Sequence, residues 1–314
     1  MLTYALAVLA ACANAVSSVL QRKANREVPR KQNLSWKLIR SLLHEPVWFG
    51  GVLAITAGFL LQATALGTGQ LAVVEPILVL ELPGALILAS RVFHSHLGRR
   101  EWIPAAVMTA GLAGLLYCLS PSSGHSASVR WYAWVIGIGI NLAVVGVLVA
   151  VARRTPAGAE GDGRGGHGAR RAALLGVAAG AGFGLTAALM KGMTETFAGG
   201  FGKLFTSWQL YAMIAAGVGG MFLVQSAMNA GRLLAAQPGL TLSDPVVSIL
   251  WGVLVFQEQV RGGLYIALAA LSGLLMAVAV VYLARSPLLS GPAADQEGAA
   301  APRQPDPSTA GKNS

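Results

Sequence analysis

The chain repeats a proline-bearing phrase within two apolar segments: residues 75–83 read EPILVLELP, and residues 237–245 read QPGLTLSDP. Each phrase places a carboxylate beside its second proline, at Glu81 and at Asp244. Proline leaves backbone groups without partners, and a carboxylate in hydrocarbon is costly unless it faces protein, water or a cation. A repeated phrase of this kind, within segments long enough to cross a bilayer, is typical of a solute pathway between two related halves. We expect helix breaks at Pro76, Pro83, Pro238 and Pro245.

Composition assigns the chain to the polytopic membrane proteins. Of its 314 residues, 54% are hydrophobic and 11% are charged, and the mean hydropathy is +0.60, which excludes an ordinary soluble domain. The net charge of +10 would suggest nucleic acid in a soluble protein. Here the basic residues lie between apolar segments, where they act as topology signals and meet lipid head groups, so we expect no nucleic-acid partner. Cys12 and Cys118 have no metal-ligand spacing, and we expect no cofactor.

Apolar runs of spanning length occur nine times and predict an all-α membrane bundle. They cover residues 2–20, 47–67, 70–93, 102–119, 131–152, 172–191, 208–229, 233–256 and 262–284. An odd number of spans places the termini on opposite sides of the membrane. With the N-terminus outside, 19 of the 23 Lys and Arg residues fall in cytoplasmic segments and four fall outside. This bias predicts a multi-pass plasma-membrane protein with a cytoplasmic C-terminus.

The repeat extends beyond the prolines. A shift of 169 residues sets one triplet of small residues, spaced by four, on another: Ala7, Ala11 and Ala15 on Gly176, Gly180 and Gly184. Such triplets let neighbouring helices approach closely in lipid, within the chain or in a homodimer. The pattern predicts two four-helix units, residues 1–119 and 171–285, joined by a linking helix at 131–152. A single intervening helix inverts the second unit relative to the first.

Three segments lie outside these helices. The Gly-rich, mixed-charge stretch 153–170 is expected to be a flexible cytoplasmic linker. The tail 286–314, rich in Pro, Ala and Gly, is expected to be disordered. In the basic loop 21–45, Trp36 and the leucines around it suggest an amphipathic helix on the inner leaflet.

Glu75, Glu81 and Asp244 are the acidic residues that lie well inside the expected spans. Glu75 lies in the outer half of the bilayer, and the other two lie near its centre. No Lys or Arg lies at comparable depth, so each acid needs a proton, a bound cation or water; an Asp at the centre costs about 2.5–3.5 kcal/mol. Glu81 and Asp244 are the candidate metal ligands. The alternative is a permanently protonated acid bonded to a neighbouring helix.

Polar residues in line with these acids extend the candidate pathway. Around Asp244 they recur at helical spacing and mark one helix face that should look into the bundle: Gln237, Thr241 and Ser248. Other helices contribute Asn14, Ser18, Gln62 and Gln225. The alternative for each is an interhelical hydrogen bond worth roughly 0.6 kcal/mol. The chain contains no zinc-protease motif, P-loop or nucleophile elbow, so we expect no enzyme activity.

The chain resembles the drug/metabolite transporter (DMT) superfamily in the following residues: 235–238 (AAQP), 256–258 (FQE), Gly273, 72–76 and Phe93. The first copy departs from the family pattern because it has His-Ser-His where an acid is usual. Both copies lack the second helix of the usual five-helix repeat. This four-one-four plan looks like the NIPA-type magnesium transporter branch, and like actinobacterial membrane proteins rich in Ala, Val and Leu.

The resemblance implies a secondary transporter that moves a small solute by alternating access, coupled to a proton or cation. Magnesium permeation is one alternative, since Mg²⁺ prefers one or two carboxylates and keeps several waters. A non-transporting membrane scaffold is the other alternative. The expected partners are the lipid bilayer and a small-molecule or cation substrate, with a homodimer left open.

Overall fold

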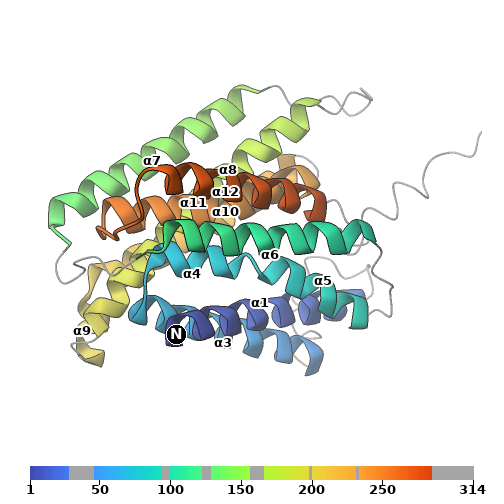
Figure 1. The fold of residues 1–314 in the computed structure, drawn as a ribbon, viewed down its shortest axis with the longest axis horizontal. Helices are drawn as coiled ribbons and strands as arrows, with labels where there is room; N and C mark the ends of the chain where they lie inside the picture. Colours follow the sequence, from blue (N-terminus) through green and yellow to red (C-terminus); the bar gives the residue numbers. More distant parts are fainter. Residues whose placement is uncertain are drawn as a thin grey trace, which may run out of the picture.

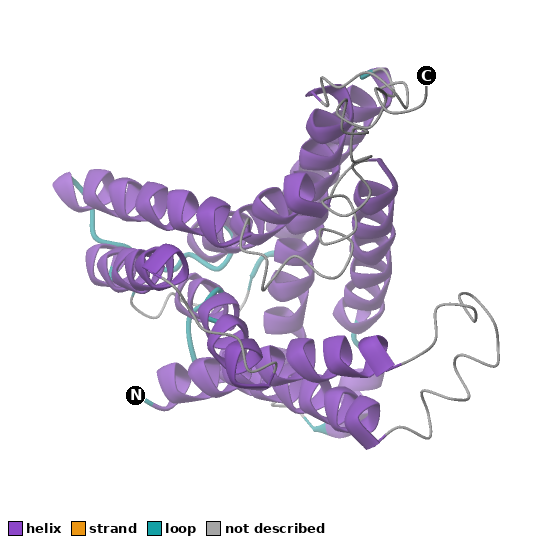
Figure 2. Cartoon of the chain, turned by 90° about the vertical axis from the view of Figure 1, so that its right-hand side faces the viewer, coloured by secondary structure: helices purple, strands orange, loops and turns teal. Residues whose placement is uncertain are grey.

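The computed structural model describes residues 1–27, 46–92, 99–121, 129–155, 166–197, 200–230 and 233–284. The elements in these ranges are helices joined by short loops (Figure 2). Their bounds are α1 (Leu2–Glu27), α3 (Pro46–Thr68), α4 (Leu71–Leu78), α5 (Glu81–Val92), α6 (Arg99–Leu119), α7 (Trp131–Arg154), α8 (Gly166–Phe197), α9 (Phe201–Thr206), α10 (Trp208–Ala230), α11 (Leu233–Leu254) and α12 (Leu264–Ala284). The prediction of an all-α protein is confirmed.

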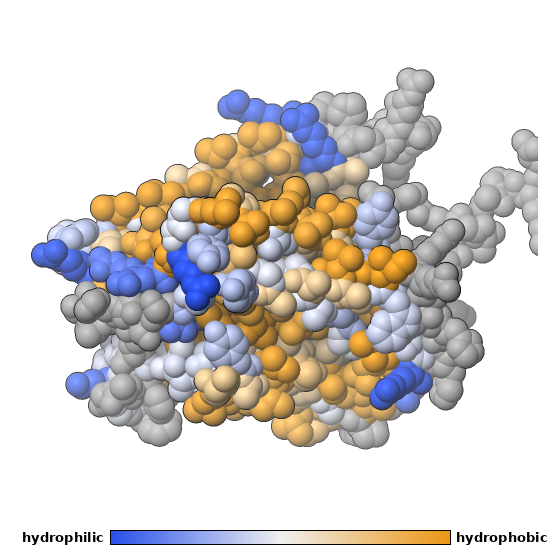
Figure 3. Space-filling view, viewed as in Figure 1, coloured by the Kyte–Doolittle hydropathy of each residue, from blue (hydrophilic) through white to orange (hydrophobic). Residues whose placement is uncertain are grey.

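Eight spans in the described part are long and apolar enough to cross a membrane: α1, α3, α4 with α5, α6, α7, α8, α10 and α12. The ninth expected span is the 22-residue helix α11, which is not among these eight. Apolar side chains such as Ile140, Phe222 and Leu274 point outward, and hydrophobic residues dominate the face in Figure 3. An apolar exterior around helical backbone is what hydrocarbon requires, so the fold is a polytopic membrane helix bundle.

One packing pattern occurs twice in the bundle. Helix α1 packs against α3, α4 and α5, and α8 packs against α10 and α11. Helix α6 lies along α12 in the middle of the molecule, and α4 contacts α11 (Figure 1). Helix α7 lies at the edge opposite α1 and α3, and packs on α8 (Figure 1). A helix, α7, is therefore present at the periphery where the sequence predicted a linking helix at 131–152.

The glycine triplet of α8 brings that helix into close contact with α11. A Cβ added at Gly176 would meet the carbonyl oxygen of Ala236, and one added at Gly180 would meet Ser243 Oγ. At Gly184 an added Cβ would lie 2.9 Å from Val247 Cβ. The triplet therefore serves a contact within the chain. Its alanine counterpart on α1 is buried too, at 0% to 3% exposure.

The first predicted helix break is present, and the second prediction is wrong. The chain leaves helical geometry between α4 and α5, where Val79 N–H donates to Pro76 O at 3.2 Å, and Pro83 falls in the first turn of α5. In contrast, Pro238 and Pro245 lie inside one continuous helix, α11. Membrane helices tolerate proline where neighbouring helices support the backbone, and α8 packs along α11 past both prolines.

Other boundaries also differ from the prediction. Helix α1 continues to Glu27, so the first residues of the expected basic loop 21–45 belong to this helix. Residues 28–45, where the amphipathic helix was expected, lie outside the described residues. Helix α8 begins at Gly166, inside the stretch expected to be a linker, of which 156–165 are not described. The expected disordered tail, 286–314, lies outside the described residues as well. The sequence pattern did not predict α9, a six-residue helix.

The contact between α8 and α11 yields a test of packing. Gly180→Ala should lower the melting temperature in detergent, because its methyl group would overlap Ser243 Oγ, and overpacking costs about 1–3 kcal/mol. The matched control is Gly139→Ala on α7, where an added Cβ would have nothing within 4 Å. Alanine is favoured over glycine in a helix by about 1 kcal/mol, so the control should melt at the same temperature or higher. Equal losses in both variants would contradict the close contact.

Candidate functional site

A polar cavity of about 290 Å³ lies between α1, α3 and the start of α5. Glu81, the first residue of α5, accepts a hydrogen bond from Ser18 Oγ at 2.8 Å. Asn14 and Gln62 complete the predicted site residues that line this cavity. The remaining lining residues are Ser17, Gln21, Ile55 and Phe59. The structure thus brings together four of the residues that the sequence selected, from three helices.

Gln62 connects this cavity with a buried carboxylate. Its Nε2 donates to Glu75 Oε1 at 2.8 Å, and Glu75 is 4% exposed. Glu75 in turn interacts electrostatically with Asp244 of α11. Since Glu75 belongs to α4 and Asp244 to α11, the two carboxylates lie near enough to interact where these helices meet.

Buried polar atoms at Asp244 and beside it lack hydrogen-bond partners in the described part of the chain. Asp244 Oδ1 and Ser248 Oγ are both buried, and neither has a hydrogen-bond partner among the residues that the structure describes. Ser248 still lies close enough to Asp244 to interact with its carboxylate. A buried polar atom without a partner costs about 1–3 kcal/mol, and more when it is charged. A proton or a small cation held here would relieve both that cost and the repulsion between the carboxylates.

The structure therefore pairs the acids differently from the predicted metal ligands, Glu81 and Asp244. Asp244 interacts with Glu75, whereas Glu81 bonds to Ser18 and lines the cavity. No group of three or more His, Cys, Asp or Glu side chains that could hold a metal ion occurs within the described ranges. The site therefore contains one pair of carboxylates, Glu75 and Asp244, and one separate carboxylate, Glu81.

Two further predicted residues lie away from the large cavity. Gln237 lines a second cavity of about 20 Å³ between α8, α10 and α11, which has room for about one water molecule. Gln225 is exposed on α10 and lines neither cavity, so the structure does not bring it together with the other predicted site residues. The reason is that small residues of α10, Gly220 and Ala227, form the face that packs inward. Thr241 is partly buried on α11.

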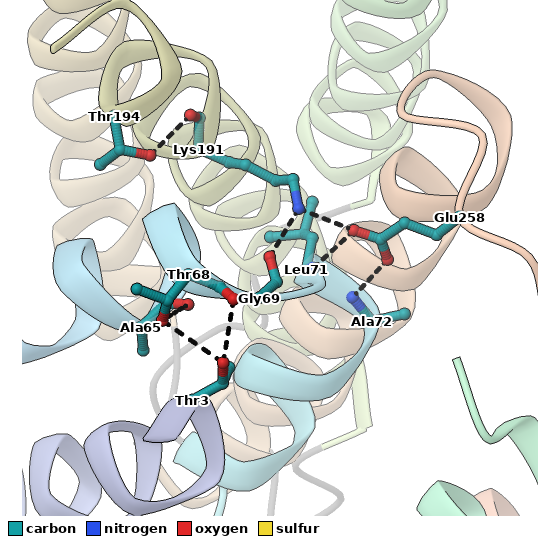
Figure 4. Close-up of polar contacts among 9 residues, drawn as sticks. All are labelled: Thr3, Ala65, Thr68, Gly69, Leu71, Ala72, Lys191, Thr194 and Glu258. Atoms are coloured by element: carbon teal, nitrogen blue, oxygen red, sulfur yellow. Dashed lines mark hydrogen bonds and ion pairs between the residues drawn. The ribbon is translucent and has the colours of Figure 1, made fainter. Parts of the chain in front are cut away.

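A buried ion pair was missed by the sequence analysis. Lys191 Nζ lies 3.0 Å from Glu258 Oε1, and the two side chains are 6% and 2% exposed. Lys191 Nζ also donates to the carbonyl oxygen of Gly69 at 2.7 Å (Figure 4). Glu258 accepts from Leu71 N–H at 2.6 Å and from Ala72 N–H at 2.9 Å, which caps the N-terminus of α4 (Figure 4). The signal available in sequence was the acid after Phe256, which follows the resemblance quoted above.

Aromatic side chains enclose this ion pair. Lys191 Nζ lies 5.2 Å from the ring centre of Phe256, a residue that is 1% exposed. Phe256 packs edge-on against Trp134 of α7, and Trp134 also packs on Trp208 and Trp251. The cluster keeps water from the charges, so both must find their partners within the protein.

Comparison with known proteins gives one relative, which aligns with most of this chain. The chain is 29% identical over 291 residues to an uncharacterized protein of Corynebacterium glutamicum, a match that covers 90% of this chain and 95% of the relative. No protein-family model matches the chain, and no solved structure matches it. The two sequences are therefore similar from end to end.

The two buried acids should respond to neutralisation in opposite directions. Glu258→Gln leaves Lys191 buried without its counter-charge and should lower the free energy of unfolding by about 3–5 kcal/mol. Asp244→Asn removes one of two interacting negative charges and should leave the free energy of unfolding unchanged or raise it. Thermal unfolding of both purified variants in one detergent at neutral pH measures the difference. A loss for Asp244→Asn as large as that for Glu258→Gln would show that Asp244 holds the fold together.

Proposed function

We propose that the protein is a secondary transporter of the DMT superfamily that moves a small solute across the plasma membrane by alternating access. In this proposal α1–α6 and α8–α12 are two inverted four-helix units, linked by α7, with the N-terminus outside. The packing of α1 on α3 and α5, matched by that of α8 on α10 and α11, supports the two-unit arrangement. The cytoplasmic excess of Lys and Arg supports the inversion and the orientation.

The observation that carries the proposal is the partly open cavity with polar walls between helices of an apolar bundle. Its walls contain Glu81, Asn14 and Ser18, and its volume of about 290 Å³ suits a small solute. Hydrocarbon offers no reason to keep polar side chains around a cavity unless something polar enters it. A membrane scaffold, the second alternative, has no use for such a cavity.

The interacting carboxylates supply a means of coupling. While Glu75 and Asp244 both carry charge, their repulsion favours separation of α4 from α11. A proton or cation bound between them removes that repulsion and favours close approach. Because Gln62 bonds to Glu75 and lines the cavity, a solute that displaces Gln62 also alters the bonding of this pair. Ion and solute would then bias the same equilibrium between two facing states.

Magnesium permeation remains a second candidate, in line with the resemblance to the NIPA-type branch. The observation that favours it is the presence of three carboxylates, Glu75, Glu81 and Asp244, within the spans. Mg²⁺ keeps several waters and needs one or two carboxylates, which a wet cavity beside Glu81 can offer.

Coupled transport is tested in proteoliposomes that enclose a pH-sensitive dye. A panel of small amines, amino acids, sugars and organic acids is added outside, and a transported solute should dissipate an imposed pH gradient. Asp244→Asn should reduce this solute-driven proton flux to the level of protein-free vesicles. The matched control is Gln225→Leu, which removes a polar side chain outside both cavities and should keep the wild-type flux. Wild-type flux in Asp244→Asn would refute its coupling role.

The magnesium candidate has its own readout. A host deficient in magnesium uptake should regain growth at limiting Mg²⁺ if the protein is a magnesium permease, and Glu81→Gln should then abolish the rescue. Growth rescue without any solute-driven proton flux would replace the first proposal by the second.

A further inference from the structure

We propose that Lys191, Glu258 and residues 69–72 form a latch that closes one end of the transport pathway and must open in each cycle. This inference rests on the proposed alternating access and names the contact that holds one of its states. The latch lies at the end of the molecule that carries α9, close to the start of α1, where Thr3 Oγ1 donates to Thr68 O at 3.1 Å (Figure 4).

The latch joins three segments that are far apart in the sequence. Residues 69–72 connect α3 to α4 in the first unit, whereas Lys191 belongs to α8 and Glu258 follows α11 in the second. Three polar contacts of 2.6 to 2.9 Å cross between the units at this point, whereas the ion pair joins Lys191 and Glu258 within the second unit. Every crossing contact ends on Lys191 or Glu258, so separation of the units here breaks all three together.

Burial of the charges makes the latch a two-state contact. A partly opened latch would leave the ion pair in an apolar surrounding without its contacts to residues 69–72, and buried polar groups that lose their partners are costly. Full opening instead lets water solvate both ions, which stay paired. Since water then replaces the lost contacts, the open and closed states can lie within a few kcal/mol of each other. A contact of this kind can therefore open during a cycle.

Local backbone geometry is adapted to seat the carboxylate. A Cβ added at Gly252 would meet Glu258 Oε2 and would lie 3.3 Å from Ala72 N, so α11 can approach α4 only with glycine there. Gln257 adopts a left-handed conformation, with φ of 53°, that turns Glu258 back toward the end of α11. Glu258 N–H donates to Gly252 O at 2.9 Å and fixes this turn.

The cavity lies beyond the latch, toward the opposite end of α1. It is lined by α1 residues from Asn14 to Gln21, and Gln21 is 18 residues from Thr3, or about 27 Å along the helix. The sequence repeat places Arg22 at the position of Lys191 in the first unit, but no acidic residue occurs between Glu81 and Glu101. The sequence repeat therefore offers no acid at the position that corresponds to Glu258. Without solute, the state closed at the latch end should be the more stable one.

Cysteine accessibility tests the latch without knowledge of the solute. A reporter, Asn14→Cys, is placed in the cavity in a Cys12→Ala, Cys118→Ala background, and labelling by a membrane-impermeant sulfonated maleimide is followed over time. Lys203→Cys, exposed on α9, identifies the membrane face to which the reagent must be added. From that face the reporter should react slowly with the latch intact. Adding Glu258→Gln should speed the reaction about tenfold or more, since one partner of a buried pair is lost.

The matched control is Arg261→Gln, which removes an exposed charge at the same end of the molecule without touching the latch. It should leave the rate of reporter labelling at the wild-type value. An unchanged rate in a folded Glu258→Gln protein would overturn the latch, because a merely structural ion pair would lower the melting temperature without opening the cavity to this face.

A disulfide lock decides the matter even if Glu258→Gln does not fold. A Cβ added at Gly67 lies 3.3 Å from Thr194 Cβ, which is within reach of a disulfide between α3 and α8 beside the latch. Gly67→Cys with Thr194→Cys, oxidised, should block solute-driven proton flux, and a reductant should restore it. Undiminished flux through the oxidised protein would overturn the latch and leave transport standing. Absence of flux in every form would refute the proposed transport, and reporter labelling would still show whether this end opens.

Discussion

The structure depends on one constraint, which is that hydrocarbon satisfies neither charge nor backbone polarity. Each polar group inside the bundle must find its partner on another helix or at a place that water or an ion can reach. Three of the acids follow this rule. Glu81 is bonded to Ser18, Glu75 to Gln62 and Glu258 to Lys191, and each bond joins a different segment of the chain to the acid. The acids therefore lie where helices meet, and the positions of those meetings define the site.

Two kinds of buried acid result, and they differ in what they leave unsatisfied. The carboxylate of Glu258 accepts hydrogen bonds from three donors of the protein, on Lys191, Leu71 and Ala72, so it needs no further partner. Asp244 interacts with another carboxylate, and its Oδ1 and the neighbouring Ser248 Oγ find no partner in the described part of the chain. A carboxylate whose partners all lie within the protein is suited to stabilise one conformation. A carboxylate that lacks partners is suited to bind a proton, an ion or a solute reversibly. The same chemistry thus serves two tasks according to its surroundings.

The sequence alone predicted what depends on local pattern. Hydropathy predicted the helices and the linking helix α7, and the spacing of Pro76 and Pro83 predicted the break between α4 and α5. What the sequence did not predict depends on contacts between distant segments. Pro238 and Pro245 do not interrupt α11, because the glycines of α8 support it; Gln225 points outward, because α10 turns its small residues inward. Glu258 was missed as a buried partner, since nothing near it in the sequence shows that its carboxylate reaches the N-terminus of α4, 187 residues away.

The two related sets of helices differ in their small-residue triplets and in the free space beside them. On α8, glycines allow α11 to approach until Ser243 Oγ reaches the carbonyl of Val177 at 3.0 Å. On α1, the matching residues carry methyl groups, and a Cβ added at Gly84 would lie 3.3 Å from Ala15 Cβ, which is a tight contact. The first set of helices has a cavity of about 290 Å³, whereas the cavity beside Gln237 in the second set measures about 20 Å³. The polar side chains around the larger cavity, among them Glu81 and Asn14, therefore have room for a ligand that the second set lacks.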